Sequence, residues 1–233
     1  AKDIIWHQYL DMYVQSSFYP LFSLLFGYGI AMQFSKAEML GRSFYSFVPK
    51  RLLAIFVIGL LHAFLIWWGD ILMTYAFCGL FLIALVRFKP MLLLIVAFLL
   101  NSAFHLFYGG GMALMGVFNK EIEQPALDIA LLEKAVTAYG TGDWMDAFTQ
   151  RLTDLTVQFS TTMWFVALVT ILPYMLVGAA LAKWCVIERA NELKWQWIVL
   201  AVLFVAAGLA IKSLPIQLAN TYGFSYLKVY VGG

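Results

Sequence analysis

Six long runs without a charged residue constrain the fold of this chain more than any motif does. They cover residues 12–35, 52–69, 71–86, 90–119, 155–182 and 195–211. A charge at the bilayer centre costs about 2.5–3.5 kcal/mol on insertion scales, so such runs are typical of membrane-spanning helices. Backbone polar groups in lipid must be satisfied internally, and the alternation of barrel strands is absent. The sequence therefore predicts an all-α integral membrane protein with six transmembrane helices.

Composition supports this prediction and excludes several functional classes. Hydrophobic residues make up 63% of the 233 residues and charged residues 12%, whereas soluble domains average roughly 45–50% and 25%. So few charges exclude a soluble enzyme and a nucleic-acid binder with a basic face. Cys78 and Cys185 define neither a disulfide framework nor a zinc motif. We expect both to be small core residues.

The positions of lysine and arginine predict the orientation in the membrane. The links at residues 36–51, 87–89 and 183–194 are basic, whereas residues 120–154 hold three basic and seven acidic residues. Basic links face the cytoplasm by the positive-inside rule. The sequence thus predicts spans one to four in residues 1–118, an extracytoplasmic helical segment at 119–159, and spans five and six at 160–212. Residues 213–233 resemble the start of a further segment, so we expect a longer protein.

The extracytoplasmic segment has two predicted helices of its own. Pro125 suits a first helical turn, residues 140–142 break the pattern, and Asp143 is a plausible N-cap. Each helix has one apolar stripe: Ile129, Leu132, Val136 and Tyr139, then Trp144, Phe148, Leu152, Leu155 and Phe159. These helices lie on the membrane surface or cap a pocket, and they act either as a packed connector or as a substrate lid. Farther along, Pro173 should kink span five.

A few polar side chains lie inside the apolar runs. His62 is 11 residues beyond Arg51, about 16 Å along a helix, which predicts a depth near the middle of the membrane. Asn101 is 12 residues beyond Lys89, at about 18 Å, and His105 shares its helix face. A neutral histidine at such a depth suits general acid–base chemistry or proton relay.

These side chains predict one candidate site. His62, Tyr75, Asn101 and His105 would line a cavity that opens outward, with Asp70 at its mouth. Asp70 lies eight residues beyond His62, about 12 Å along a continuous helix, so a direct His–Asp pair is disfavoured unless the helix unwinds. The alternatives are hydrogen bonds between helices for the imidazoles and the amide, and a helix-capping role for Asp70.

Two stretches resemble the YeiB-like family of bacterial multi-pass membrane proteins. The first is the Leu21–Gly29 run, Leu-Phe-Ser-Leu-Leu-Phe-Gly-Tyr-Gly. The second is a long hairpin motif made of Arg51-Leu-Leu, Gly59-Leu-Leu-His62, Trp68-Gly-Asp70-Ile-Leu and Tyr75-Ala76. Tyr139-Gly, Asp143-Trp144 and Arg151 extend the similarity weakly. The chain lacks the family's Asp-x-x-Arg-Gly opening helix and its last spans, and Lys50 stands where the family usually has arginine.

The resemblance implies a location and a function. The family is similar at the fold level to transmembrane acyltransferases of the heparan-glucosaminide N-acetyltransferase type. That similarity implies a bacterial inner-membrane acyltransferase, with His62 and Asp70 as candidate functional residues. The donor would be cytoplasmic, with acetyl-CoA as the candidate cofactor, and the acceptor an extracytoplasmic glycan or lipid head group. Arg51, Lys50 and Arg87 could attract the donor's phosphates, or could act only as topology signals.

Two other functional classes remain open from the sequence. A small-molecule transporter would use the same polar residues as a substrate site near the midplane. A non-catalytic membrane protein would bind a partner, or a second copy of itself, through its extracytoplasmic helices. In each case the chain contacts membrane lipid and is not expected to bind nucleic acid.

Overall fold

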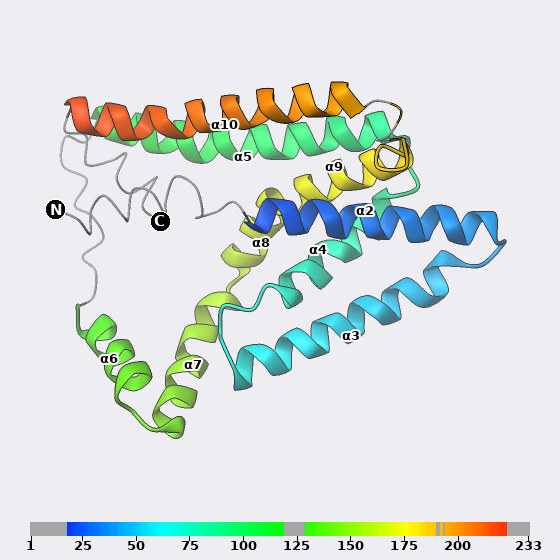
Figure 1. Cartoon of the computed structure of the whole chain (residues 1–233). Coiled ribbons are helices and arrows are strands. Elements are labelled where there is room, and N and C mark those ends of the chain that lie inside the picture. Colours follow the sequence, from blue (N-terminus) through cyan, green and yellow to red (C-terminus); the bar gives the residue numbers. More distant parts are fainter. Residues whose placement is uncertain (1–17, 119–128, 190–191, 193, 223–233) are drawn as a thin grey trace. The chain divides into compact units, whose positions relative to one another are not determined.

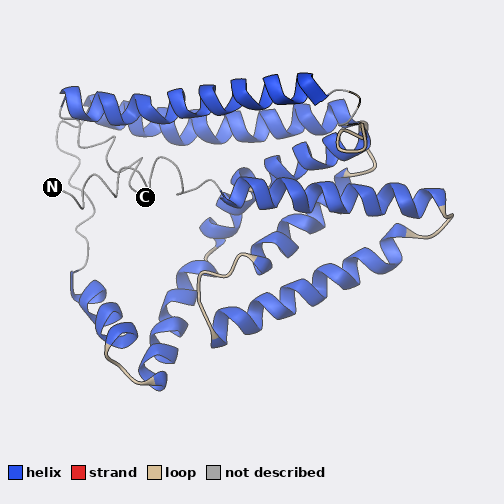
Figure 2. Ribbon diagram, in the orientation of Figure 1, coloured by secondary structure: helices blue, strands red, loops and turns tan. Residues whose placement is uncertain are grey.

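The computed structural model describes residues 18–118, 129–189, 192 and 194–222, and all the regular structure in this part of the chain is helical (Figures 1 and 2). This confirms the predicted all-α class for the described residues. The helices are α2 Phe18–Met39, α3 Phe44–Leu65, α4 Leu72–Leu85, α5 Pro90–Phe118, α6 Ile129–Gly140, α7 Trp144–Gln158, α8 Thr161–Thr170, α9 Leu172–Lys183 and α10 Lys194–Tyr222.

Among the residues that the structure describes, three helical segments are long and apolar enough to cross a membrane, which indicates a membrane protein but does not support the predicted count of six spans. They are Phe44–Leu65, Pro90–Phe107 and Thr161–Lys183. With 14 residues, α4 is about 21 Å long, shorter than a hydrocarbon core of about 30 Å. Polar and small residues such as Ser23 and Gln33 make α2 less apolar. The apolar part of α10, Lys194–Ala210, is also short.

The third of these segments is interrupted next to a proline, as the sequence predicted. Helix α8 ends at Thr170, α9 begins at Leu172, and Pro173 follows in the first turn of α9. Proline has no N–H to donate, and its ring collides with the carbonyl of the preceding turn. The interruption at Ile171 is therefore a local consequence of Pro173.

The chain divides into two compact units, and the larger one, residues 23–183, holds the candidate site. Within it, α3 packs along α4, α5 packs against α8 and α9, and α9 also touches α4. The core between these helices is apolar, with Met73, Leu82, Met175 and Leu176 fully buried. Helices α4 and α9 thus separate α3 from α5 (Figure 1).

Two glycines allow α2 to cross α9 at very short range. A Cβ atom on Gly27 would overlap the backbone carbonyl of Met175, and one on Gly178 would overlap that of Leu24. The two backbones therefore approach as closely as in the small-residue contacts of membrane helix pairs.

Helix α3 keeps a broad apolar face uncovered by the rest of its unit. Exposed side chains recur at helical spacing along it: Leu53, Val57, Ile58, Leu61 and Leu65. Exposure of an apolar stripe of this length to water is unfavourable, whereas lipid chains can cover it without that cost. The exposure of this face therefore agrees with α3 being one of the candidate spans.

Helices α6 and α7 form a hairpin, and α7 begins at the N-cap residue that the sequence predicts. Asp143 accepts a hydrogen bond from the backbone N–H of Asp146, and the Asp146 side chain accepts one from the Asp143 N–H, which completes a capping box. Trp144 and Phe148 stack at 5.2 Å on one face. Pro125 lies outside the described residues.

The other unit, residues 1–22 and 184–233, is described by α10 and the turn before it. Cys185 is exposed, with a φ of 53°, so the expectation that it is a core residue is wrong; Cys78 is buried as expected. A positive φ is uncommon for residues other than glycine, and it places Cys185 in the turn that follows α9. The turn also carries an exposed ion pair between Arg189 and Glu192 at 3.5 Å.

Candidate functional site: a histidine–aspartate pair at the end of α3

His62 lies in the last turn of α3, three residues before the helix ends at Leu65. The sequence predicted a position near the middle of the membrane, counted from a span that begins at residue 52. The helix instead begins at Phe44, because Pro49 is accommodated within it and the first turns continue from the preceding loop. His62 is therefore close to one end of the candidate span, where polar groups and water are more accessible.

Nδ1 of His62 lies 2.9 Å from Oδ2 of Asp70. The expected separation of about 12 Å assumed one continuous helix, and that assumption is wrong. The chain leaves the helix after Leu65, and residues 66–71 turn back, so that Asp70 returns beside the last turn of α3. The ring N–H is not aligned on the carboxylate, so a small rotation of the imidazole would convert the ion-pair contact into a hydrogen bond.

The Asp70 carboxylate is fixed by a second contact. Its Oδ1 accepts a hydrogen bond of 3.0 Å from the backbone N–H of Met73 in the first turn of α4. A carboxylate at this position satisfies a free helix N–H and is stabilised by the helix dipole. The expected helix-capping role of Asp70 is thus present together with the contact to His62. Asp70 is only 4% exposed.

Gly59 makes room for this arrangement. It lies one turn before His62, and a Cβ atom there would come within 2.6 Å of Asp70 Oδ1 and 2.7 Å of the Met73 nitrogen. Ala63, the next small residue on the same face, is fully buried against Met73 and Leu155. Gly59 and Ala63 therefore set the approach of α4 to α3, and with it the position of Asp70.

The imidazole remains accessible. One third of the His62 side chain is exposed, against 2% for Asp70. With Nδ1 held at the carboxylate, Nε2 is the nitrogen left to exchange a proton with another molecule. A partly exposed imidazole with a buried carboxylate at its other nitrogen is the arrangement of a general base, because the carboxylate orients the ring.

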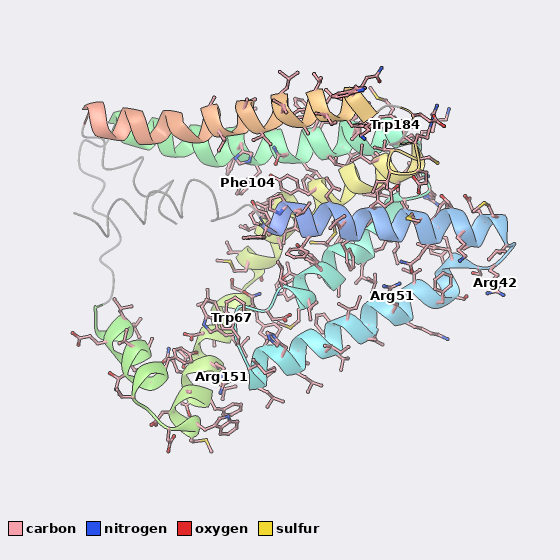
Figure 3. The ribbon with its side chains drawn as sticks, in the orientation of Figure 1. Arg42, Arg51, Trp67, Phe104, Arg151 and Trp184 are labelled. Carbon is pink, nitrogen blue, oxygen red and sulfur yellow. The ribbon has the colours of Figure 1, made fainter. Side chains whose placement is uncertain are left out.

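Helix α7 holds the turn that carries Asp70. The guanidinium of Arg151 donates hydrogen bonds to the carbonyls of Leu65 and Ile66 at the end of α3. The amide of Gln158 donates to the carbonyl of Asp70 at 3.3 Å. Figure 3 shows Arg151 reaching from α7 toward the turn, where Trp67 is labelled.

Sequence reasoning did not identify Arg151 or Gln158 from the residues themselves. A signal was present for Arg151, since Trp144, Phe148, Arg151 and Leu155 follow one helical stripe at spacings of four, three and four. An arginine inside an apolar stripe requires a buried partner. We had assigned Leu152 to the stripe instead, and Leu152 is exposed whereas Arg151 is buried.

Helix α6 supports α7 through a second polar network. The Tyr139 hydroxyl donates to Asp154 at 2.6 Å, and the Gln150 amide donates to the other carboxylate oxygen at 3.0 Å. Desolvation and the adjacent carboxylate raise the pKa of Tyr139, so its hydroxyl stays protonated and continues to donate. The α6–α7 hairpin is thus braced one residue from Arg151.

The remaining predicted site residues lie elsewhere in the unit. Tyr75 is buried on α4, where its hydroxyl accepts a hydrogen bond of 3.0 Å from Ser23 of α2. Asn101 and His105 belong to α5, which packs mainly against α8 and α9, and His105 is exposed with its ring against Phe104 at 5.5 Å. The structure therefore brings His62 and Asp70 together, and it does not bring the side chains of α5 to that pair.

The predicted phosphate-binding residues lie at the opposite end of α3. Arg51 donates to Gln33 of α2 at 3.0 Å, and both line a cavity of about 130 Å³ together with Gly29. Lys50 and Arg87 are exposed, and the Arg87 guanidinium lies 5.2 Å from the Phe88 ring. Of these residues, Arg51 thus adjoins a described cavity. Among the described residues, no group of three histidine, cysteine or acidic side chains could hold a metal ion.

Curated proteins from bacteria are similar to the chain. It is 32% identical over 184 residues to "Uncharacterized protein YxaH" of Bacillus subtilis (strain 168), a match that covers 75% of this chain and 44% of that protein. It is 33% identical over 89 residues to an uncharacterized 39.9 kDa protein encoded in the amylase 3' region of Bacillus acidopullulyticus, covering 38% and 25%. It is 35% identical over 82 residues to "Uncharacterized protein YeiB" of Escherichia coli (strain K12), covering 35% and 20%.

These similarities support the YeiB-like resemblance. The chain spans less than half the length of each of these relatives. No protein-family model matches the chain, and no solved structure matches it significantly.

Proposed function

We propose that this chain belongs to a multi-pass bacterial inner-membrane acyltransferase of the YeiB-like kind, with His62 as the general base. The observation that carries the proposal is the 2.9 Å contact between the partly exposed imidazole and the buried Asp70 carboxylate. This pair can remove a proton from a hydroxyl or amine, which is what acyl transfer requires. The three candidate spans support the membrane location, and the bacterial relatives support the organism class.

The distribution of charge supports an orientation for the reaction. Arg51 and its cavity adjoin the basic loop at residues 36–51, which the positive-inside rule assigns to the cytoplasm. His62 lies 11 residues farther along α3, about 16 Å toward the other face. A cytoplasmic acyl-CoA donor could place its phosphates near Arg51, and an acceptor would reach His62 from outside.

The proposed reaction is a single transfer in which every bond is accounted for. Nε2 of His62 takes the proton from the acceptor hydroxyl or amine as that oxygen or nitrogen attacks the thioester carbonyl. The carbon–sulfur bond breaks, the acyl group stays on the acceptor, and the thiolate takes up a proton to become the thiol. Asp70 holds the ring by Nδ1 and stabilises the imidazolium that forms in between.

Transfer of a labelled acetyl group tests the proposal. The full-length protein in lipid nanodiscs would be given labelled acetyl-CoA and a bacterial glycolipid extract as acceptor. We expect wild-type protein to label the lipid fraction, and His62→Gln to lower the rate about 10²- to 10⁴-fold, the usual contribution of a general base. Asp70→Asn should lower it as well. His105→Gln, a matched substitution of an exposed histidine on α5, should have no effect.

Two results would contradict acyl transfer. One is the absence of label on any acceptor with wild-type protein. The other is a transfer rate in His62→Gln that equals the wild-type rate.

A further inference from the structure

The turn that carries Asp70 is held at both ends by a single helix from another part of the sequence. Arg151 binds the carbonyls of Leu65 and Ile66 where the turn begins, and Gln158 binds the carbonyl of Asp70 where it ends. More than 80 residues separate these partners along the chain. The geometry of residues 66–71 is therefore set by the docking of α7.

Arg151 is a buried cation at a site that requires one. It is 6% exposed, and it lies at the carboxyl end of α3, where the last carbonyls of a helix have no partners within the helix and carry partial negative charge. The ring of Trp144 lies 6.0 Å from the guanidinium carbon. A neutral side chain here would leave the carbonyls of Leu65 and Ile66 without these donors, and such buried acceptors are costly.

Helix α7 is packed against α3 and α4, so its side chains can hold the turn in one position relative to these helices. Leu155, one turn beyond Arg151, is buried against Ala63 and Met73, which flank the His62–Asp70 pair on α3 and α4. Arg151 also bonds the Ala147 carbonyl of its own helix through Nε at 3.3 Å. The guanidinium thus joins a rigid helix to the start of a turn that has little regular structure of its own.

We propose that Arg151 is a positioning residue that holds the 66–71 turn so that Asp70 stays against His62. This inference rests on the proposed function, because it assigns Arg151 a role in the same site. Arg151 touches neither reacting group and acts through the turn. Its removal lets the turn relax, the carboxylate moves away from Nδ1, and the imidazole loses its orientation.

The test measures the environment of His62 directly, without relying on catalysis. Full-length protein in nanodiscs is treated with diethyl pyrocarbonate, and carbethoxylation of His62 is followed by peptide mass spectrometry, with His105 as internal control. Asp70→Asn defines the change in labelling rate when the carboxylate is lost. We expect Arg151→Gln to change the rate in the same direction, by about threefold or more, as for residues coupled in one network.

A double-variant cycle separates positioning from a general loss of stability. If Arg151 acts through Asp70, Arg151→Gln adds nothing to Asp70→Asn, and Arg151→Lys, which keeps a cationic donor, restores much of the wild-type rate. Thr153→Ala, an exposed substitution on α7, is the matched control. Should Arg151→Gln not fold, Gln158→Leu tests the other end of the turn and is expected to shift His62 labelling in the same direction.

Additive effects of the two substitutions, or a wild-type rate of His62 labelling in Arg151→Gln, would overturn the positioning role. Failure of the proposed function gives a different pattern, with the expected labelling cycle but no acyl transfer by wild-type protein. Where transfer is observed, Arg151→Gln should lower kcat about tenfold and leave the acceptor KM unchanged.

Discussion

At the residue scale, the candidate site depends on the absence of a side chain at Gly59 as much as on the polar groups of His62 and Asp70. His62 and Asp70 can meet because Gly59 presents no Cβ atom to the carboxylate or to the first turn of α4. Asp70 then accepts a hydrogen bond from the Met73 N–H and lies 2.9 Å from the imidazole, so one carboxylate contacts both α3 and α4. The chemistry and the packing of the two helices are therefore coupled at a single position.

Gly59→Ala should separate the two helices at the site. The new methyl group overlaps the Met73 backbone nitrogen and the Asp70 Oδ1 atom that is hydrogen-bonded to it, so neither atom can yield freely. We expect a loss of about 1–3 kcal/mol in stability, as for overpacking in a core, together with altered carbethoxylation of His62. Denaturation in mixed micelles measures the first effect, and peptide mass spectrometry the second.

Gly29→Ala is the matched control for that substitution. Gly29 also lies within a helix, but a Cβ atom there meets nothing within 4 Å. Replacement of a helical glycine by alanine should then be neutral or stabilising, by up to about 1 kcal/mol. Equal behaviour of the two variants would show that the α3–α4 approach at Gly59 is not as close as described.

At the element scale, the sequence predicts a helix boundary correctly where the residues that cause it lie within a few positions of that boundary. Asp143 begins α7 through a capping box with Asp146, and Pro173 breaks the segment that contains α8 and α9. Helix α3 begins at Phe44, earlier than the charge-free run that starts at residue 52, because the helix continues through the charged residues before that position. Charge limits the length of a membrane span, whereas it does not prevent a helix from continuing beyond the bilayer.

Loss of the capping box should loosen α7 from its first turn. Asp143→Ala removes one acceptor for the free N–H groups, at a cost of about 1 kcal/mol. Amide exchange in the first turns of α7 should then be about fivefold faster, since this energy corresponds to that factor. Hydrogen exchange with mass spectrometry reports it, with Thr149→Ala as the control on the same helix. Unchanged exchange in this region would argue against the box.

At the scale of the whole molecule, helix length and hydropathy give fewer spans than the charge-free runs did. Three segments satisfy both criteria, and α4 is too short to cross a bilayer of average thickness without help. Nevertheless, α3 and α4 are packed together and the turn between them contains a tight polar network. The orientation of α4 therefore decides which side of the membrane residues 87–89 reach.

Cysteine accessibility in intact cells determines this topology. In a background without Cys78 and Cys185, single cysteines would replace Lys50, Lys89, Lys134 and Thr153. An impermeant maleimide should label the cysteines at 134 and 153 in intact cells. It should label those at 50 and 89 only after permeabilisation. Labelling at 89 from outside would mean that α4 does not cross, and labelling at all four positions would contradict the orientation.

The sequence by itself determined the class of the protein and its local structure. Runs of apolar residues, the capping residue Asp143 and the breaking residue Pro173 act within a few residues of their own positions, so they can be interpreted without coordinates. The identities of His62 and Asp70 as candidates also came from the sequence. Their neighbour Arg151 was noted there only through the family resemblance.

Only the tertiary structure decided how these residues meet. The His62–Asp70 contact requires the chain to leave α3 and turn back within six residues, so that Asp70 lies against Gly59, one helical turn before His62. The contact also depends on α7, whose Arg151 donates hydrogen bonds to the turn from more than 80 residues away in the sequence. The assignment of Asn101 to the same cavity did not account for α4 and α9, which lie between α3 and α5. Contacts of this kind depend on packing between distant segments, which no local pattern encodes.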